Sequence, residues 1–149
     1  MLMKLTLDSF LRRFGFQRRN KKHGGNINLG HDKIRQVVIR MNDYMAEDQP
    51  YLKTHYNIRD LAEEMKLPSY QLSALLNRHM GTNFNDYLNQ YRVKHCQQLI
   101  MEGEAGNLNL KGLSAKCGFH NRNTFTTAFK KFTGQTPSVY TRYQKQMVS

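Results

Sequence analysis

An internal repeat constrains this chain more than any other feature of its sequence. At an offset of 52 residues, Ile58, Leu61, Ala62, Met65 and Leu67 align with Leu110, Leu113, Ser114, Cys117 and Phe119. At an offset of 53, Leu72, Leu76, Gly81, Phe84 and Tyr87 align with Phe125, Phe129, Gly134, Pro137 and Tyr140. The change of offset places one extra residue in the second inter-helix turn. The repeat indicates two copies of one supersecondary unit.

Each copy has the pattern of a helix-turn-helix. A helix of about two turns is followed by a tight turn and a helix of about three turns, which ends before Gly81 or Gly134. Between the copies, apolar residues recur at helical spacing from Phe84 to about Glu102, which predicts one long linker helix. We therefore expect helix-turn-helix units at about 57–81 and 109–134, joined by a linker helix at about 84–102 that holds them at a fixed separation.

The region before the repeat also follows helical spacing. Apolar residues share one helix face at Ile34, Val37, Val38, Met41 and Met45, Asp32 is a plausible N-cap, and Pro50 ends the segment. Long strands of alternating polarity are not visible. The sequence predicts an all-α fold, with residues 32–149 as one domain.

Residues 1–31 have a different character. Met3, Leu7, Phe10, Leu11 and Phe14 lie on one helix face, and a basic run and a glycine-containing stretch follow. We predict an amphipathic helix and a flexible linker, which act as an arm for nucleic acid or a membrane surface, or else dock weakly. Charged residues interrupt any run long enough to cross a bilayer, and no secretion signal is evident.

Charge points to a polyanionic partner. The net charge is +12 and the pI is about 9.9. Residues 1–32 carry +5 and residues 104–149 carry +6, while residues 57–103 are neutral. The two cysteines, Cys96 and Cys117, lack metal-ligand spacing and favour a reducing cytoplasm. No metal or cofactor is expected, and without a phosphate-binding glycine loop or a nucleophile with a matching base, neither is catalysis.

The second helix of a helix-turn-helix lies in the major groove, with its apolar stripe toward the core. In the second copy, Phe125, Ala128, Phe129 and Phe132 form that stripe. Arg122 and Asn123 suit bidentate pairing with guanine and adenine, and threonines at 124, 126 and 127 can reach bases or a thymine methyl group. The base contacts predicted here are Arg122, Asn123, Thr124, Thr126 and Thr127.

The first copy carries less charge. Leu72, Leu75 and Leu76 form its stripe, and the predicted base contacts on its other faces are Tyr70, Gln71, Ser73, Ala74 and Asn77. Phosphate contacts are predicted for both copies at Arg78, Lys111, Asn121, Lys130, Lys131 and Thr136. Because its region is neutral, we expect this copy to add backbone positioning more than sequence discrimination.

Two stretches resemble the DNA-binding domain of AraC/XylS-type bacterial transcription regulators: CGFHNRNTFTTAFKKFTGQTPSVY, residues 117–140, and FNDYLNQYRV, residues 84–93. The resemblance spans about Ile58 to Tyr143. It implies a seven-helix domain whose recognition helices, at about Ser69–His79 and Asn121–Phe132, enter successive major grooves roughly 34 Å apart. It also implies a role at promoters, where such proteins help recruit RNA polymerase, most often as activators. The family's base-reading positions fall on Tyr70, Ser73, Ala74, Arg122, Asn123, Thr126 and Thr127.

The chain departs from the family pattern in three places. Lys66 stands in the first turn where the second has Gly118, and Pro68 replaces a capping residue, so the first turn should be less regular. His79 takes the place of Phe132 and is expected to pack rather than to switch. Residues 1–57 are too few for the ligand-binding domain of many members, so no small-molecule effector domain is expected in this chain.

A second hypothesis comes from another class of protein. The basic amphipathic N-terminus could make the chain a membrane-tethered or protein-interaction module. Tight binding to anionic vesicles without preference among DNA sequences would favour this hypothesis over the DNA-binding regulator.

Overall fold

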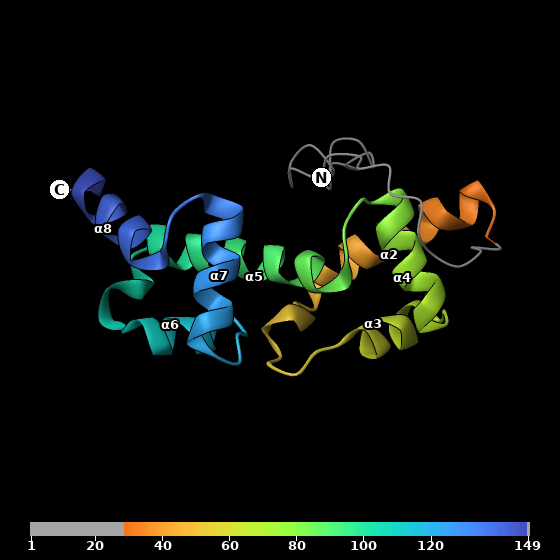
Figure 1. The fold of residues 1–149 in the computed structure, drawn as a ribbon, viewed down its shortest axis with the longest axis horizontal. Helices are drawn as coiled ribbons and strands as arrows, with labels where there is room; N and C mark the ends of the chain where they lie inside the picture. The colour runs from red at the N-terminus through yellow and green to blue at the C-terminus, as the bar shows by residue number, and fades with distance from the viewer. Residues whose placement is uncertain (1–28, 149) are drawn as a thin grey trace. The chain divides into compact units, whose positions relative to one another are not determined.

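The computed structural model describes residues 29–148, and every secondary-structure element in this range is a helix (Figure 1). Their elements are the α-helices α2 (His31–Glu47), α3 (Ile58–Met65), α4 (Ser69–His79), α5 (Phe84–Met101), α6 (Leu110–Lys116), α7 (Arg122–Thr133) and α8 (Pro137–Val148), and the 3-10 helices η1 (Pro50–Leu52) and η2 (Glu104–Asn107). No strand occurs in this part of the chain, which confirms the predicted all-α class. The predicted amphipathic helix near the N-terminus lies outside the described residues.

The described residues divide into two compact units that do not follow chain order. Unit 1 comprises residues 29–49 and 57–87, and unit 2 comprises residues 50–56 and 88–148. Helix α5 contributes its first residues to unit 1 and the rest to unit 2. The segment that connects α2 to α3 therefore belongs to the unit that contains α6, α7 and α8.

In unit 1, α2 supplies the apolar face that the sequence predicted, with Ile34, Val37, Val38, Met41 and Met45 buried. The predicted N-cap at Asp32 is wrong, because the helix begins at His31 with Gly30 as its N-cap. Asp32 instead lies in the first turn, where a carboxylate interacts favourably with the helix dipole. On α2, Arg40 Nη2 donates a 2.6 Å hydrogen bond to the carbonyl oxygen of Glu64 on α3.

Helices α3 and α4 form the helix-turn-helix of unit 1. A capping box starts α3, because Asn57 Oδ1 accepts from the amide of Arg59 at 2.9 Å and the amide of Asn57 donates to Asp60 Oδ2 at 2.8 Å. Helix α4 starts at Pro68, whose side chain offers no capping bond. Lys66, between the two helices, adopts a left-handed backbone with φ 55°. This conformation is costly for a residue with a Cβ, so the first turn carries backbone strain. The amides of Lys66 and Leu67 nevertheless close the end of α3 by donating to the carbonyl oxygens of Glu63 and Ala62.

Unit 2 has an aromatic cluster that joins the turn before α7, α7 itself and α8. Phe119 lies 5.2 Å from Phe125, Phe125 lies 5.8 Å from Phe129, and Phe129 lies 5.3 Å from Tyr140 of α8, all between ring centroids. Phe132, which the sequence assigned to the buried stripe, is only partly buried against this cluster. It lies in the last turn of α7, where the helix leaves the core.

The segment 50–56 is held in unit 2 by Arg92 of α5. The Arg92 guanidinium donates from Nε to the carbonyl oxygen of Tyr51 at 2.7 Å and from Nη2 to that of Lys53 at 3.0 Å. It also lies 5.5 Å from the centroid of the Phe119 ring. Burial lowers the pKa of Arg92 to about 10, so the side chain stays protonated at neutral pH.

Gly118 makes this packing possible. Its φ is 86°, and a Cβ at this position would overlap the carbonyl oxygen of Tyr51 and lie 2.9 Å from the Cα of Leu52. Lys66 and Gly118 both adopt the left-handed backbone conformation, and at Gly118 the segment 50–56 is packed against the turn. Glycine is required there for space as well as for conformation.

Candidate nucleic-acid interface

Helix α7 begins with a defined cap. The side chain of Asn121 accepts a 2.8 Å hydrogen bond from the amide of Thr124, which fixes the first turn. That turn places Arg122, Asn123 and Thr124 in solvent, while Phe125, Ala128 and Phe129 enter the core one turn further along. The second recognition helix therefore starts within one residue of its predicted position, and its N-terminal turn presents polar side chains outward.

The outer face of α7 is polar and basic, and its first two side chains have no protein partner among the described residues. Arg122 and Asn123 make no side-chain hydrogen bond or ion pair with any residue in 29–148. Thr127 and Lys130 are exposed and Thr126 is half-buried. These donors need break no protein contact to meet a ligand. Arg122, Asn123, Thr126 and Thr127 lie toward the start of α7, and Lys130 and Lys131 lie toward its end.

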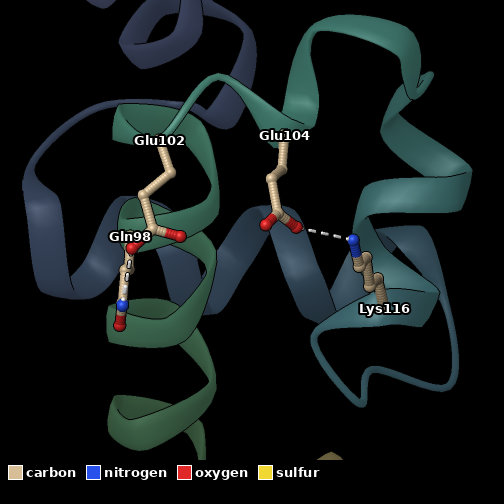
Figure 2. A network of polar contacts seen from close by, with 4 residues as sticks. All are labelled: Gln98, Glu102, Glu104 and Lys116. Carbon is tan, nitrogen blue, oxygen red and sulfur yellow. Dashed lines mark hydrogen bonds and ion pairs between the residues drawn. The ribbon is translucent and has the colours of Figure 1, made fainter.

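The charge around α7 is nearly all positive. Residues 104–149 contain one acidic side chain, Glu104, and it pairs with Lys116 of α6 at 2.9 Å, as Figure 2 shows beside the Gln98–Glu102 hydrogen bond of 2.8 Å. The ion pair cancels that single carboxylate. No other acidic side chain in residues 104–149 therefore weakens the attraction between the basic side chains of α7 and a polyanion.

Helix α4 of unit 1 presents a different surface. Tyr70 is 64% exposed, so its ring is accessible to a ligand. Asn77 donates to the Ser73 carbonyl at 2.8 Å, and Gln71 donates to the Tyr70 hydroxyl at 3.4 Å. The amides of this helix are therefore partly used within α4. They must exchange these bonds before they can read a base.

The expectation that Ala74 faces outward is wrong. Ala74 is 5% exposed and lies among the buried residues of α4 with Leu72, Leu75 and Leu76. The leucine stripe indicates which face meets the core, but a single methyl group is short enough to be covered between longer side chains one turn away. Ala74 therefore offers little surface to a ligand, and Tyr70 and Ser73 remain the more accessible of the family's base-reading positions here.

The predicted phosphate contacts are mostly accessible. Arg78, Lys111, Asn121, Lys130 and Lys131 are exposed, and Thr136 is half-buried. Lys131 Nζ lies 5.7 Å from the centroid of the Phe132 ring. Thr136 Oγ1 accepts from the amide of Val139 at 3.4 Å, at the start of α8. Two of these residues, Asn121 and Thr136, thus support helix starts themselves.

Apart from Pro50, which was expected to end a helix, residues 50–56 contain no motif that indicates a role, yet the structure brings them to the start of α7. The ring centroids of His55 and His120 lie 5.1 Å apart, and His120 directly precedes the N-cap Asn121. His55, His120 and Lys53 are exposed. No local pattern could have indicated this contact, because 65 residues separate the two histidines.

Other chemistry finds little support in the described residues. Cys96 and Cys117 are both buried, and their mutual hydrogen bond, together with burial, raises the pKa of the Cys96 thiol. Among residues 29–148 there is no group of three or more metal-ligating side chains, and no helix is long and apolar enough to span a bilayer. A cleft of about 640 Å³ lies between α6 and α8, lined by Leu108, Leu110, Leu113, Arg142 and Lys145. It is separate from the outer face of α7.

Two helix-turn-helix units with a polar, basic recognition helix define a DNA-binding protein of the double helix-turn-helix class. A family model described as "Helix-turn-helix domain" matches residues 61–143, more than half of the chain. The chain belongs to this family, in its AraC-type form, and is the DNA-binding domain of a transcription regulator.

Relatives agree with this assignment. The HTH-type transcriptional activator RhaR of Escherichia coli strain K12 is 30% identical over 95 residues, which are 64% of this chain and 33% of RhaR. The chain thus spans about a third of the length of the curated relatives it matches. The C-terminal domain of the response regulator yesN from Fusobacterium nucleatum is 27% identical, with a TM-score of 0.57, over 68% of this chain and 93% of that one. The DNA-binding domain of AdpA, solved with a target DNA, shares the fold at 17% identity and a TM-score of 0.60, over 72% of this chain and 95% of that one.

Proposed function

We propose that this chain binds specific double-stranded DNA sequences by placing α4 and α7 in two successive major grooves, and that it activates transcription. The outer face of α7 carries this proposal. Arg122 and Asn123 are exposed, free of side-chain contacts among the described residues, and held on a capped helix start. Because these donors have no protein partner among residues 29–148 to give up, binding costs only the ordering of the side chains themselves, about 0.5–1.5 kcal/mol for each.

The roles within α7 follow from the chemistry of each side chain. The planar guanidinium of Arg122 matches the O6 and N7 acceptors of guanine, and the amide of Asn123 matches N6 and N7 of adenine. Thr126 and Thr127 offer hydroxyl donors and methyl groups, which suit a thymine methyl. Lys130 and Lys131 follow two turns later and suit phosphate oxygens.

Helix α4 has the supporting role. Its amides are partly bonded within the helix, Ala74 is buried, and Tyr70 extends into solvent. We assign to α4 the fixing of register on the duplex, through Tyr70, Ser73 and Arg78, more than discrimination between bases.

Selection of bound sequences from a random DNA pool tests this function, followed by affinity measurements on the selected site. We expect Arg122→Ala and Asn123→Ala each to cost about 1–3 kcal/mol of binding and to relax preference at one position. Lys130→Ala should weaken binding to all sequences alike. Arg142→Ala on α8 removes the same charge as Arg122→Ala away from the α7 face and is the matched control. Equal effects of Arg122→Ala and Arg142→Ala would reject the assignment.

Activation rests on the likeness to RhaR, whose name describes a transcriptional activator. A reporter gene placed downstream of the selected site should give more transcript when the whole protein is present, because the bound protein helps recruit RNA polymerase to the promoter. A fall in transcript would instead make the protein a repressor. The affinity measurements above stand independently of either result.

A further inference from the structure

The segment 50–56 has a fixed position in unit 2, where Pro50, Tyr51 and Tyr56 are buried and Lys53 and His55 are exposed. Arg92 holds its backbone through the carbonyl oxygens of Tyr51 and Lys53, at 2.7 and 3.0 Å. The Tyr51 ring stacks on Tyr91 at 5.5 Å and meets His95 edge-on at 6.1 Å, measured between centroids. Gly118 lacks the Cβ that would push the segment away. Contacts on three sides therefore determine where the next residues of the segment lie.

Those next residues lie beside the start of the recognition helix. The ring of His55 is 5.1 Å from that of His120, and only Asn121 separates His120 from α7. Figure 1 shows the loop before α7 next to the loop that carries residues 50–56. Lys53, His55 and His120 are all exposed. The two histidines are in ring contact, and Lys53 lies two residues before His55 on the segment whose backbone Arg92 holds. We call these residues the Lys53–His55–His120 patch.

The chemistry of this patch suits a phosphate. An ammonium and two imidazoles supply N–H donors, and neither 50–56 nor 116–124 contains an aspartate or a glutamate. The N-terminal residues of a recognition helix enter the groove, so residues just before that helix lie at the groove edge, where the sugar-phosphate backbone runs. We infer that the Lys53–His55–His120 patch is a third element of the DNA interface and binds backbone phosphates that flank the groove read by α7.

This inference rests on the proposed function, and it gives Arg92 a part in DNA binding as a positioning residue. Arg92 is buried, and its hydrogen bonds to this segment go to backbone carbonyl oxygens. It acts through the backbone of Tyr51 and Lys53. Phosphate contacts add affinity without discriminating between sequences, so the patch should strengthen binding to every DNA site by the same factor.

Salt titration of DNA binding by the full chain tests the patch. We expect Lys53→Gln to weaken binding to both the selected site and a scrambled site, and to reduce the slope of log affinity against log salt by about 0.9, the value for one phosphate contact. The double variant His55→Gln, His120→Gln should lose affinity about threefold or more, as expected for two lost hydrogen bonds. Lys145→Gln, in the last turn of α8, removes the same charge and should leave the slope within about 0.3 of the wild-type value.

Equal slopes for Lys53→Gln and Lys145→Gln would overturn the inference. Ethylation interference gives a second readout: phosphates beside the α7 half-site should interfere with wild-type binding and lose that effect in the Lys53→Gln protein. Unaltered interference would likewise overturn it. If Arg122→Ala abolishes preference while Lys53→Gln changes nothing, the patch is wrong and the proposed function stands. If the wild-type protein shows no preference among sequences, the proposed function itself fails.

Discussion

Replacing Gly118 by alanine should destabilise the protein far more than the small size of the added methyl group suggests. An L-residue in the left-handed region, at φ 86°, costs roughly 1–2 kcal/mol. The new Cβ would also overlap the Tyr51 carbonyl oxygen and lie 2.9 Å from Leu52 Cα and 3.1 Å from Arg92 Nε. Two of these neighbours are backbone atoms that Arg92 holds in place, so overpacking should add about 1–3 kcal/mol. The sum is roughly 2–5 kcal/mol.

Gly134 provides the matched control. Its φ is 78°, and a Cβ added there would meet no heavy atom within 4 Å. Gly134→Ala therefore carries the conformational cost without the steric one, roughly 1–2 kcal/mol. The difference between the two variants isolates the packing of residues 50–56 against the turn before α7.

Urea denaturation followed by far-UV circular dichroism measures both free energies of unfolding. We expect Gly118→Ala to lose at least about 1 kcal/mol more than Gly134→Ala. Losses that agree within about 0.5 kcal/mol would refute the reasoning. They would mean that residues 50–56 move aside freely, and the patch built on them would lose its fixed position as well.

Three further predictions concern unit 2. Arg92→Leu should lower the free energy of unfolding, measured by urea denaturation, by on the order of 2 kcal/mol, because the carbonyl oxygens of Tyr51 and Lys53 lose their donors. Arg92→Lys should lose less. An unchanged stability of Arg92→Leu would contradict the role of these two hydrogen bonds. Asn121→Ala should cost about 1 kcal/mol through the lost N-cap, and Asn121→Asp should restore most of it, which a fully destabilised Asp variant would disprove. Burial, and then the charge of Lys116, lower the pKa of His95 from 6.5, against the opposing effect of Glu102 and Glu104. The fold therefore favours the neutral imidazole, and stability should fall as the pH drops below about 6.5. His95→Gln should flatten this dependence in melting curves taken from pH 7.5 to 5.5, and an identical dependence in that variant would exclude His95 as its source.

Local sequence patterns predicted the helices closely. The linker helix, expected at Phe84 to about Glu102, ends at Met101. The family resemblance, rather than the local pattern, placed the first recognition helix at about Ser69–His79, where it is found. The apolar face of α2 matches residue for residue. Helical periodicity, glycine at helix ends and the internal repeat can be recognised in the sequence without knowledge of the fold, because they depend on residue spacing along the chain.

Errors occurred where neighbours in space determine the outcome. The exposure of Ala74 depends on the side chains around it. The predicted cap of α2 was wrong because the helix begins at His31, before Asp32. The partial burial of Phe132 depends on where the core ends along α7. None of these is encoded in the spacing of apolar residues, which reports only the direction of a face.

By itself, the sequence determined the double helix-turn-helix, the recognition face of α7 and its positive charge, because composition and helical spacing are properties of contiguous residues. Tertiary structure alone decided that residues 50–56 belong with unit 2 and that His55 meets His120. Arg92 reaches back 41 and 39 positions to its two carbonyl acceptors. Such contacts depend on which surfaces fold against each other, and here they bring a chain segment without a recognisable motif to the start of α7.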